Sequence, residues 1–295
     1  MQKNVGVYGL GSMGFGMAQS LLRAGHNVFG HDIRPEPVAR LSAEGGQQTD
    51  NPGLFDAVCL VVLNAKQTKA ILFGEDGIAA SLRQGAVVIS CATVAPEFAT
   101  EMEAQCAAYG VHYLDAPISG GSVKAAEGAL SIMAAGTKPA FEAARPVLSA
   151  ICENLFELGD KAGAGSVMKS VNQLLAGVHI AAMAEALTFG VKQGLEPSLF
   201  LEVISQCAGT SWMLENRAPH IIAGDYTPHS AVNIWLKDLG IVQDVARDEG
   251  VAIPLARAAL AQFTAAAEMG CGGEDDAAVA KVYARYAAVT LPSQG

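Results

Sequence analysis

The fold is decided by Gly9-Leu10-Gly11-Ser12-Met13-Gly14, which directly follows a short apolar run and opens a segment of helical spacing at residues 12–23. This order of strand, glycine turn and helix places the N-terminus of a helix where it can face a pyrophosphate. Gly9 permits the tight turn, Gly11 lets the backbone approach the phosphates, and Gly14 allows helix and strand to pack closely. A G-x-G-x-x-G match alone is weak in a chain with 32 glycines, so the flanking pattern carries the prediction that all six residues bind a dinucleotide.

An acidic residue, Asp32, ends the second apolar run and stands 23 residues after Gly9. At this position a carboxylate accepts hydrogen bonds from the ribose hydroxyls of the adenosine, and it repels the 2′-phosphate of NADP. The sequence therefore predicts NAD as the cofactor, with Arg34 close enough to leave some use of NADP open. FAD is disfavoured because no further flavin motif follows, and a glycine turn that binds nothing is the remaining interpretation.

Short β-branched runs alternate with longer stretches of helical spacing through the first half of the chain. The runs are residues 5–9, 27–32, 57–63, 86–91 and 111–118, followed by 129–135 and 154–158. Strands that alternate with helices are the signature of a parallel sheet covered by helices. We therefore predict an NAD-binding Rossmann domain over residues 1–163, with a mostly parallel, doubly wound sheet.

The pattern changes after residue 163, where apolar residues recur at helical spacing with almost no strand-like run. Residues 166–193 form one long candidate helix of about 28 residues, or ~42 Å at 1.5 Å per residue. Gly194 suits the position just past its end, and Pro197 suits the start of the next helix. We predict an all-α domain over residues 164–295 for substrate binding and oligomerisation.

Composition excludes several classes of protein. Hydrophobic residues make up 51% of the 295 and charged residues 16%, which predicts a compact globular fold. The net charge of -10, without any basic run, argues against nucleic-acid binding. No uninterrupted apolar stretch reaches the ~18 to 20 residues of a membrane-spanning helix. The six cysteines are scattered without a C-x-x-C pair, so we expect no bound metal and a cytoplasmic location.

A polar face stands out on the predicted long helix, whose other positions are mostly Ala, Val, Leu, Met or Ile. Lys169, Asn172 and Gln173 lie at i, i+3 and i+4 and so share one face. An apolar setting disfavours the charged form of a lysine, which suits the lysine to proton transfer. A surface lysine whose stem lies along the helix end is the alternative interpretation.

Four stretches together resemble the β-hydroxyacid dehydrogenase family, which includes 3-hydroxyisobutyrate dehydrogenase and tartronate semialdehyde reductase. They are the glycine turn, Asp115-Ala-Pro-Ile-Ser-Gly-Gly121, Gly163-Ala-Gly-x-x-x-Lys169-x-x-Asn172 and Lys237-Asp-Leu239. They follow the family's order and its usual intervals across nearly the whole chain. The resemblance implies hydride transfer from a small hydroxy acid to NAD, in a cleft between a Rossmann domain and a helical domain.

The resemblance also implies which residues bind and convert the substrate. Lys169 would occupy the catalytic lysine position, and Asn172 would hydrogen-bond the substrate beside it. Ser119, Gly120 and Gly121 would form the loop that binds the substrate carboxylate, because backbone N–H groups can receive an anion.

Further residues fall at the family's cofactor positions. Thr93 and Lys237 would touch the nicotinamide-ribose end of the cofactor, and Leu63 with Asn64 would line the cofactor cleft. The chain departs from the family at two points. Ala92 stands where a serine is frequent, and no proline follows the third strand near Asn64.

Within the family, residues 209–217 and the stretch Asn233-Ile-Trp-Leu-Lys237 look similar to L-threonate dehydrogenases. These enzymes oxidise a four-carbon sugar acid at its C2 hydroxyl to 2-dehydro-L-erythronate, so the resemblance implies L-threonate as the substrate. Asn172, Gln173, Ser211 and Asn233 are candidate polar contacts for a polyhydroxylated acid.

Several alternatives stay open at this point. Within the family, the substrate could be 3-hydroxyisobutyrate or tartronate semialdehyde (2-hydroxy-3-oxopropionate). Outside it, the chain could be an NAD-binding sensor without turnover, or an imine reductase, although imine reductases usually replace the lysine that stands here at Lys169. The apolar helices of the second domain predict a homodimer or homotetramer.

Overall fold

The computed structural model describes residues 2–292 of the chain. The chain divides into two compact units, Met1–Lys169 and Ser170–Gly295, which are called unit 1 and unit 2 below. The sequence pattern placed the boundary at 163/164, six residues earlier, where the strand-like runs end. All six cysteines are free.

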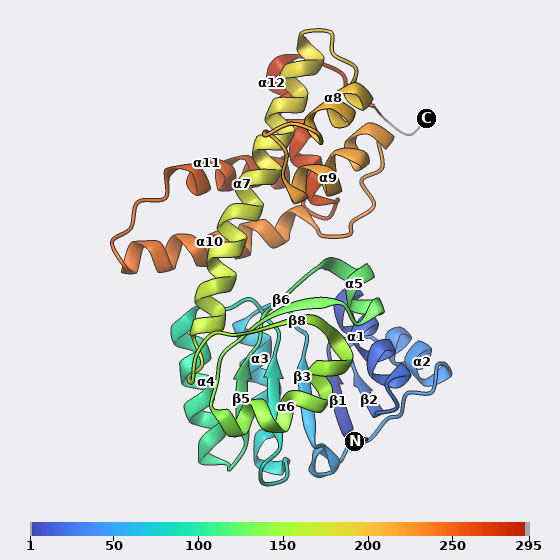
Figure 1. Ribbon diagram of the computed structural model, residues 1–295, viewed down its shortest axis with the longest axis vertical. Coiled ribbons are helices and arrows are strands. Elements are labelled where there is room, and N and C mark those ends of the chain that lie inside the picture. The colour runs from blue at the N-terminus through green and yellow to red at the C-terminus, as the bar shows by residue number, and fades with distance from the viewer. Residues whose placement is uncertain (1, 293–295) are drawn as a thin grey trace. The chain divides into compact units, whose positions relative to one another are not determined.

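Unit 1 is built on a parallel sheet of five strands in the order β2-β1-β3-β4-β5 (Figure 1). The strands are β1 (Asn4–Tyr8), β2 (Asn27–His31), β3 (Ala57–Leu60), β4 (Val87–Ser90) and β5 (His112–Asp115). Because β2 lies on one side of β1 and β3 on the other, the direction in which the chain extends the sheet reverses at β1. In open parallel sheets a ligand binds outside the carboxyl ends of the strands at such a switch point.

Helices cover both faces of this sheet because its strands are apolar on both sides. They are α1 (Ser12–Arg23), α2 (Pro35–Ala43), α3 (Ala65–Phe73), α4 (Pro96–Ala108) and α6 (Lys138–Ile151), with short 3₁₀ turns at Pro52–Leu54 and Ala79–Ser81. On β3, Cys59 packs in the cluster formed with α1 and α6, and Val58 packs in the cluster formed with α3 and α4. Successive strand residues point to opposite faces, so one strand supplies both cores.

A second, three-stranded sheet completes unit 1. It contains β6 (Ile118–Ser119), β7 (Leu130–Ala134) and β8 (Cys152–Glu157), with α5 (Gly121–Glu127) between the first two. β6 runs antiparallel to β7, and β7 runs parallel to β8. The sequence predicted one strand over residues 111–118, but the structure divides it into β5 and β6. Pro117 lies at the break and has no N–H with which to continue a ladder.

Unit 2 is helical, as the pattern predicted. The long helix α7 (Ala164–Lys192) begins in unit 1 and continues into unit 2. It is followed by α8 (Pro197–Ile204), α9 (Trp212–Ala223), α10 (Val232–Asp248), α11 (Pro254–Ala266) and α12 (Ala280–Ala287), with a π turn at Ala267–Cys271 and a 3₁₀ turn, η4, at Asp276–Val279. Trp235 of α10 stacks on Phe263 of α11 in the core, with ring centroids 5.5 Å apart. Figure 1 draws these helices in colours that run from yellow-green to red.

Among residues 2–292, only α7 is long and apolar enough to cross a membrane by length and composition. The core helix of a soluble protein passes the same test, so this is weak evidence for a membrane span. Apolar side chains nevertheless stay exposed along α7 within the single chain, among them Val171, Leu175 and Phe189.

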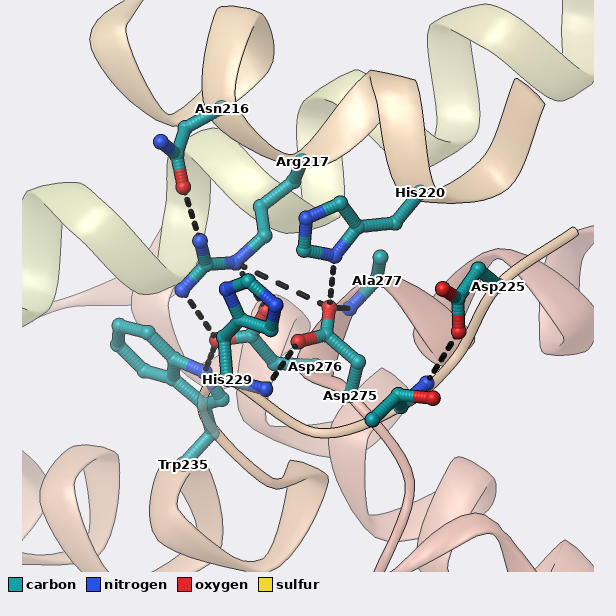
Figure 2. A network of polar contacts seen from close by, with 10 residues as sticks. Asn216, Arg217, His220, Asp225, His229, Trp235, Asp275, Asp276 and Ala277 are labelled. Carbon is teal, nitrogen blue, oxygen red and sulfur yellow. Dashed lines mark hydrogen bonds and ion pairs between the residues drawn. The ribbon is translucent and has the colours of Figure 1, made fainter. Parts of the chain in front are cut away.

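Buried charges hold α9, α10 and η4 together in unit 2 (Figure 2). The Arg217 guanidinium of α9 pairs with Asp276 at 2.5 Å, and Asp276 also accepts a hydrogen bond from the Trp235 indole at 2.8 Å. Neighbouring Asp275 contacts His220 Nδ1 at 2.9 Å and accepts the backbone N–H of His229 at 2.9 Å. Both carboxylates are fully buried.

Candidate functional site

The glycine turn has the backbone geometry that only glycine allows. Gly9 has φ +93°, and a Cβ built on it would lie 2.3 Å from the Val61 carbonyl oxygen. A Cβ on Gly14 would lie 1.9 Å from the Gly9 oxygen, so the first turn of α1 packs directly on the turn that precedes it. At Gly11, the N-cap residue of α1, a Cβ would meet no atom of the described residues within 4 Å. The backbone at Gly11 therefore remains open to a ligand.

A cavity of about 660 Å³ opens beside this turn in unit 1. Its walls include Gly9, Gly11 and Asp32, which the sequence assigned to the cofactor, and Leu63 from the carboxyl end of β3. This size lies within the usual range for ligand pockets. The apolar walls with a carboxylate at one edge fit the adenosine portion of a dinucleotide, and the helix N-terminus beside them fits its phosphates. Ser12, Met13 and Gly14 form the first turn of α1 next to this wall.

Asp32 is fixed in place by backbone hydrogen bonds at the rim of this cavity. Its Oδ2 accepts the Leu10 N–H at 2.7 Å, and its Oδ1 accepts the Arg34 N–H at 2.9 Å. The Arg34 Nε also donates to Oδ1 at 3.3 Å. Burial raises the pKa of Asp32, but the hydrogen bonds from Arg34 and Leu10 outweigh it, and the net pKa lies below its ordinary value. The group is therefore a carboxylate at neutral pH.

Two other predicted cofactor residues lie at the carboxyl ends of neighbouring strands. Asn64 is the N-cap of α3, where its side chain accepts the Gln67 N–H at 2.9 Å. Its structural role is therefore to cap the helix, while Leu63 beside it faces the cavity. Thr93 lies between β4 and α4, two residues before Ala95, the N-cap of α4.

The predicted catalytic lysine lies beside the predicted carboxylate loop within unit 1. Lys169 is only 8% exposed, and its Nζ donates to the Ile118 carbonyl oxygen at 2.8 Å. Ser119 follows Ile118 directly, and then Gly120 and Gly121 adopt φ +135° and +79°. Two left-handed glycines in succession turn the backbone sharply at this point. The loop and the Lys169 side chain are thereby brought to one place, although Ile118 and Lys169 lie 51 residues apart in the sequence.

Asp115 holds the start of α7 against the sheet, a role that sequence reasoning missed. Its Oδ2 accepts the N–H groups of Gly163 at 2.9 Å and Ser166 at 2.8 Å, and its Oδ1 accepts the Ser166 hydroxyl at 2.8 Å. Burial raises the pKa of Asp115, with these hydrogen bonds opposing the rise. Gly165 permits the close approach, because a Cβ there would lie 2.4 Å from the Met133 oxygen. The hydrogen bonds of Asp115 thereby fix the first turn of α7, the helix that carries Lys169.

The remaining predicted site residues lie in unit 2. Asn172 of α7 donates to Gln173 at 2.9 Å, and Gln173 donates to Asp238 of α10 at 2.5 Å. Lys237 pairs with the other oxygen of Asp238 at 2.5 Å. Two hydrogen bonds and one ion pair therefore connect Asn172, assigned to the substrate, with Lys237, assigned to the cofactor. The connecting side chains are Gln173 and Asp238.

Two family profiles match the chain, one on each side of residue 160. The family described as the NAD binding domain of 6-phosphogluconate dehydrogenase matches residues 4–159. The family described as NAD-binding of NADP-dependent 3-hydroxyisobutyrate dehydrogenase matches residues 163–283.

Individual relatives match over nearly the whole chain. The L-threonate dehydrogenase of Cupriavidus necator is 50% identical over 287 residues, which cover 96% of this chain and 97% of that protein. The 3-hydroxyisobutyrate dehydrogenase of Pseudomonas aeruginosa is 35% identical and covers 95% of this chain and 98% of its own. The crystal structure of 3-hydroxyisobutyrate dehydrogenase from Salmonella typhimurium has a TM-score of 0.90 at 44% identity, covering 95% of this chain and 99% of that one.

Proposed function

Because the chain belongs to the β-hydroxyacid dehydrogenase family, we propose that it oxidises L-threonate at the C2 hydroxyl with NAD as the hydride acceptor. The coarser activity is that of an oxidoreductase acting on CH–OH donors, with domains of NAD(P)-binding families. The observation that carries the proposal is the buried Lys169 amine group, held at the Ile118 carbonyl beside the loop of Ser119, Gly120 and Gly121.

In the proposed mechanism the loop at Ser119–Gly121 receives the substrate carboxylate through its N–H groups. Lys169 in its neutral amine form then takes the proton of the substrate hydroxyl and becomes an ammonium, and in the reverse direction that ammonium gives a proton to the carbonyl oxygen. When bound, the nicotinamide supplies the acceptor for the hydride that leaves the carbinol carbon. Asn172 hydrogen-bonds the substrate beside Lys169. The contact between Lys169 and Ile118 keeps the amine in reach of the loop before substrate arrives.

A panel of hydroxy acids tests the substrate assignment. With NAD present, L-threonate is expected to give NADH formation at a higher kcat/KM than D-glycerate or 3-hydroxyisobutyrate. The physical reason is that L-threonate offers more hydroxyls to polar side chains such as Asn172 than D-glycerate does, and the methyl branch of 3-hydroxyisobutyrate cannot hydrogen-bond to these side chains at all. Absorbance at the NADH band measures the rates. If 3-hydroxyisobutyrate is the better substrate, the assignment to L-threonate is wrong and the related alternative holds; if none reacts, the sensor alternative remains.

Cofactor choice is expected to depend on Asp32. The wild-type protein should prefer NAD to NADP, because the carboxylate accepts from ribose hydroxyls and repels a 2′-phosphate. Asp32→Ser should lower that preference by about 10- to 100-fold, the usual size of a lost hydrogen bond to a charged group. The ratio of kcat/KM with NAD to that with NADP is the measurement.

The matched control is Asp76→Ser, which removes an exposed carboxylate outside the cavity and should leave the ratio unchanged. A wild-type ratio in favour of NADP would contradict the role of Asp32.

The relatives also favour a second candidate function. The Pseudomonas aeruginosa protein and the Salmonella typhimurium structure are both named 3-hydroxyisobutyrate dehydrogenase, at 35% and 44% identity. The same lysine and loop would serve that substrate. The substrate panel separates the two.

A further inference from the structure

Three polar side chains form a relay in unit 2, running from Asp238 on α10 through Gln173 to Asn172 on α7. Gln173 Nε2 donates to Asp238 Oδ2 at 2.5 Å, and Asn172 Nδ2 donates to Gln173 Oε1 at 2.9 Å. Gln173 is 7% exposed and Asp238 is 3% exposed, so these two of the three side chains are shielded from water. A buried amide that loses its partner is costly, which makes the direction of each hydrogen bond well defined.

The direction of the relay is set at its Asp238 end. A carboxylate accepts hydrogen bonds and donates none, and Asp238 is paired with the Lys237 ammonium at 2.5 Å. Gln173 must therefore turn its NH₂ group toward Asp238, because the opposite orientation would set its oxygen against a carboxylate oxygen. This leaves Gln173 Oε1 as an acceptor for its other neighbour. Asn172 must then donate with its own NH₂ group, and its carbonyl oxygen is not used in the relay.

We infer that Gln173 and Asp238 are positioning residues that fix the direction of the Asn172 amide, so that Asn172 offers its carbonyl oxygen to a hydroxyl of the substrate. The inference rests on the proposed function, in which Asn172 contacts the substrate. It extends that function by naming the chemistry of the contact, a hydroxyl donor. A polyhydroxylated acid has a second hydroxyl that can donate this hydrogen bond, in addition to the hydroxyl that loses its proton to Lys169.

One substitution should reverse the direction of the hydrogen bonds along the relay. In Asp238→Asn, the Lys237 ammonium attracts the new amide oxygen, and the new NH₂ group then faces Gln173. Gln173 would turn over to accept from it, and its NH₂ group would face Asn172. Asn172 would then accept with its carbonyl oxygen and present only N–H donors to the substrate. A substitution that does not contact Asn172 would thereby change what Asn172 offers.

The first test follows the Asn172 side chain directly and needs no turnover. Protein labelled with nitrogen-15 at asparagine gives a side-chain amide signal for Asn172, assigned by its loss in Asn172→Ala. We expect this signal to shift in Asp238→Asn and in Gln173→Met, and to stay in place in Asp244→Asn, which alters an exposed carboxylate farther along α10. A signal that both relay variants leave unmoved would overturn the inference.

The second test measures coupling with the hydroxy acid that the wild-type protein oxidises best. Gln173→Met should lower kcat/KM about tenfold, the usual scale of one lost hydrogen bond, mainly through a higher KM. In an Asn172→Ala background the same substitution should lower it by less than about twofold, because the side chain that Gln173 orients is already gone. A structural role would give equal losses in both backgrounds and would contradict the inference.

Gln193→Met is the matched control, since Gln193 is exposed just past the end of α7. It should behave as wild type. The two tests also separate the inference from the proposed function. Absence of turnover on every hydroxy acid would count against the proposed function, while the amide signal would still decide whether the relay orients Asn172.

Discussion

Lys169→Ala is expected to lower kcat by about 10²- to 10⁴-fold, the range in which loss of a general acid or base usually falls. The substitution removes the group proposed to take the hydroxyl proton. It leaves the cavity beside the glycine turn intact, because Lys169 is not among that cavity's walls. The affinity for NAD should therefore stay near the wild-type value. Steady-state rates with the best hydroxy acid, together with isothermal titration of NAD, measure both quantities.

Two further variants identify what Lys169 contributes. Lys169→Arg places a permanent positive charge and hydrogen-bond donors at this position, but a guanidinium does not release its proton in proteins and so cannot act as a base, and we expect its kcat to be nearly as low. Lys192→Ala removes the exposed lysine at the end of the same helix and should retain wild-type rates. Near-normal turnover in Lys169→Ala would exclude the general-base role, and recovery in Lys169→Arg would show that charge alone suffices.

Arg217→Met is expected to destabilise the protein by about 3 to 5 kcal/mol, the usual cost of removing one partner from a buried ion pair. The methionine fills similar space, but Asp276 and Asp275 then share a buried site without the guanidinium. Such a loss is a large part of the ~5 to 15 kcal/mol that keeps a typical protein folded. Denaturant unfolding followed by tryptophan fluorescence measures it, since both tryptophans of the chain, Trp212 and Trp235, lie in unit 2.

The pH dependence of this loss distinguishes charge from packing. Burial raises the pKa of Asp276, and the Arg217 charge opposes that rise. Without Arg217 the folded state holds the Asp276 proton more tightly than the unfolded state, so stability increases as pH falls. The difference between wild type and Arg217→Met should therefore shrink at acidic pH. A loss of stability in Arg217→Met that stays constant with pH would indicate that Arg217 stabilises the fold through its packing and not through its charge. Arg257→Met, at an exposed position on α11, should cost less than about 0.5 kcal/mol.

The sequence predicted those parts of the fold that depend on local pattern. Helical spacing over residues 12–23 corresponds to α1, and spacing over 166–193 corresponds to α7 at Ala164–Lys192. Alternating runs predicted the parallel sheet because β-branched strands and amphipathic helices carry their periods in neighbouring residues. The glycine turn was recognisable because its conformation restricts the residue type at Gly9 and Gly14.

Contacts between distant segments could not be read from pattern. Asp115 lies 51 residues before Ser166, and nothing near either residue marks them as partners. The second sheet was missed for the same reason, since residues 129–135 read as a strand without any indication of which strands they pair with. His220 likewise contacts Asp275, which lies 55 residues later. In each case the chemistry depends on a partner that only folding brings near.

The buried charges of unit 2 also bear on how the chain folds while it is being made. Arg217 leaves the ribosome well before Asp276, which lies 59 residues later. Both sheets of unit 1 are complete in sequence by Glu157, so the N-terminal unit has all its strands early in synthesis. Arg217 of α9 and Trp235 of α10 must instead remain without their buried partner until Asp276 has been synthesised. The buried charges of unit 2 can therefore pair only after the stretch that carries Asp276 has left the ribosome.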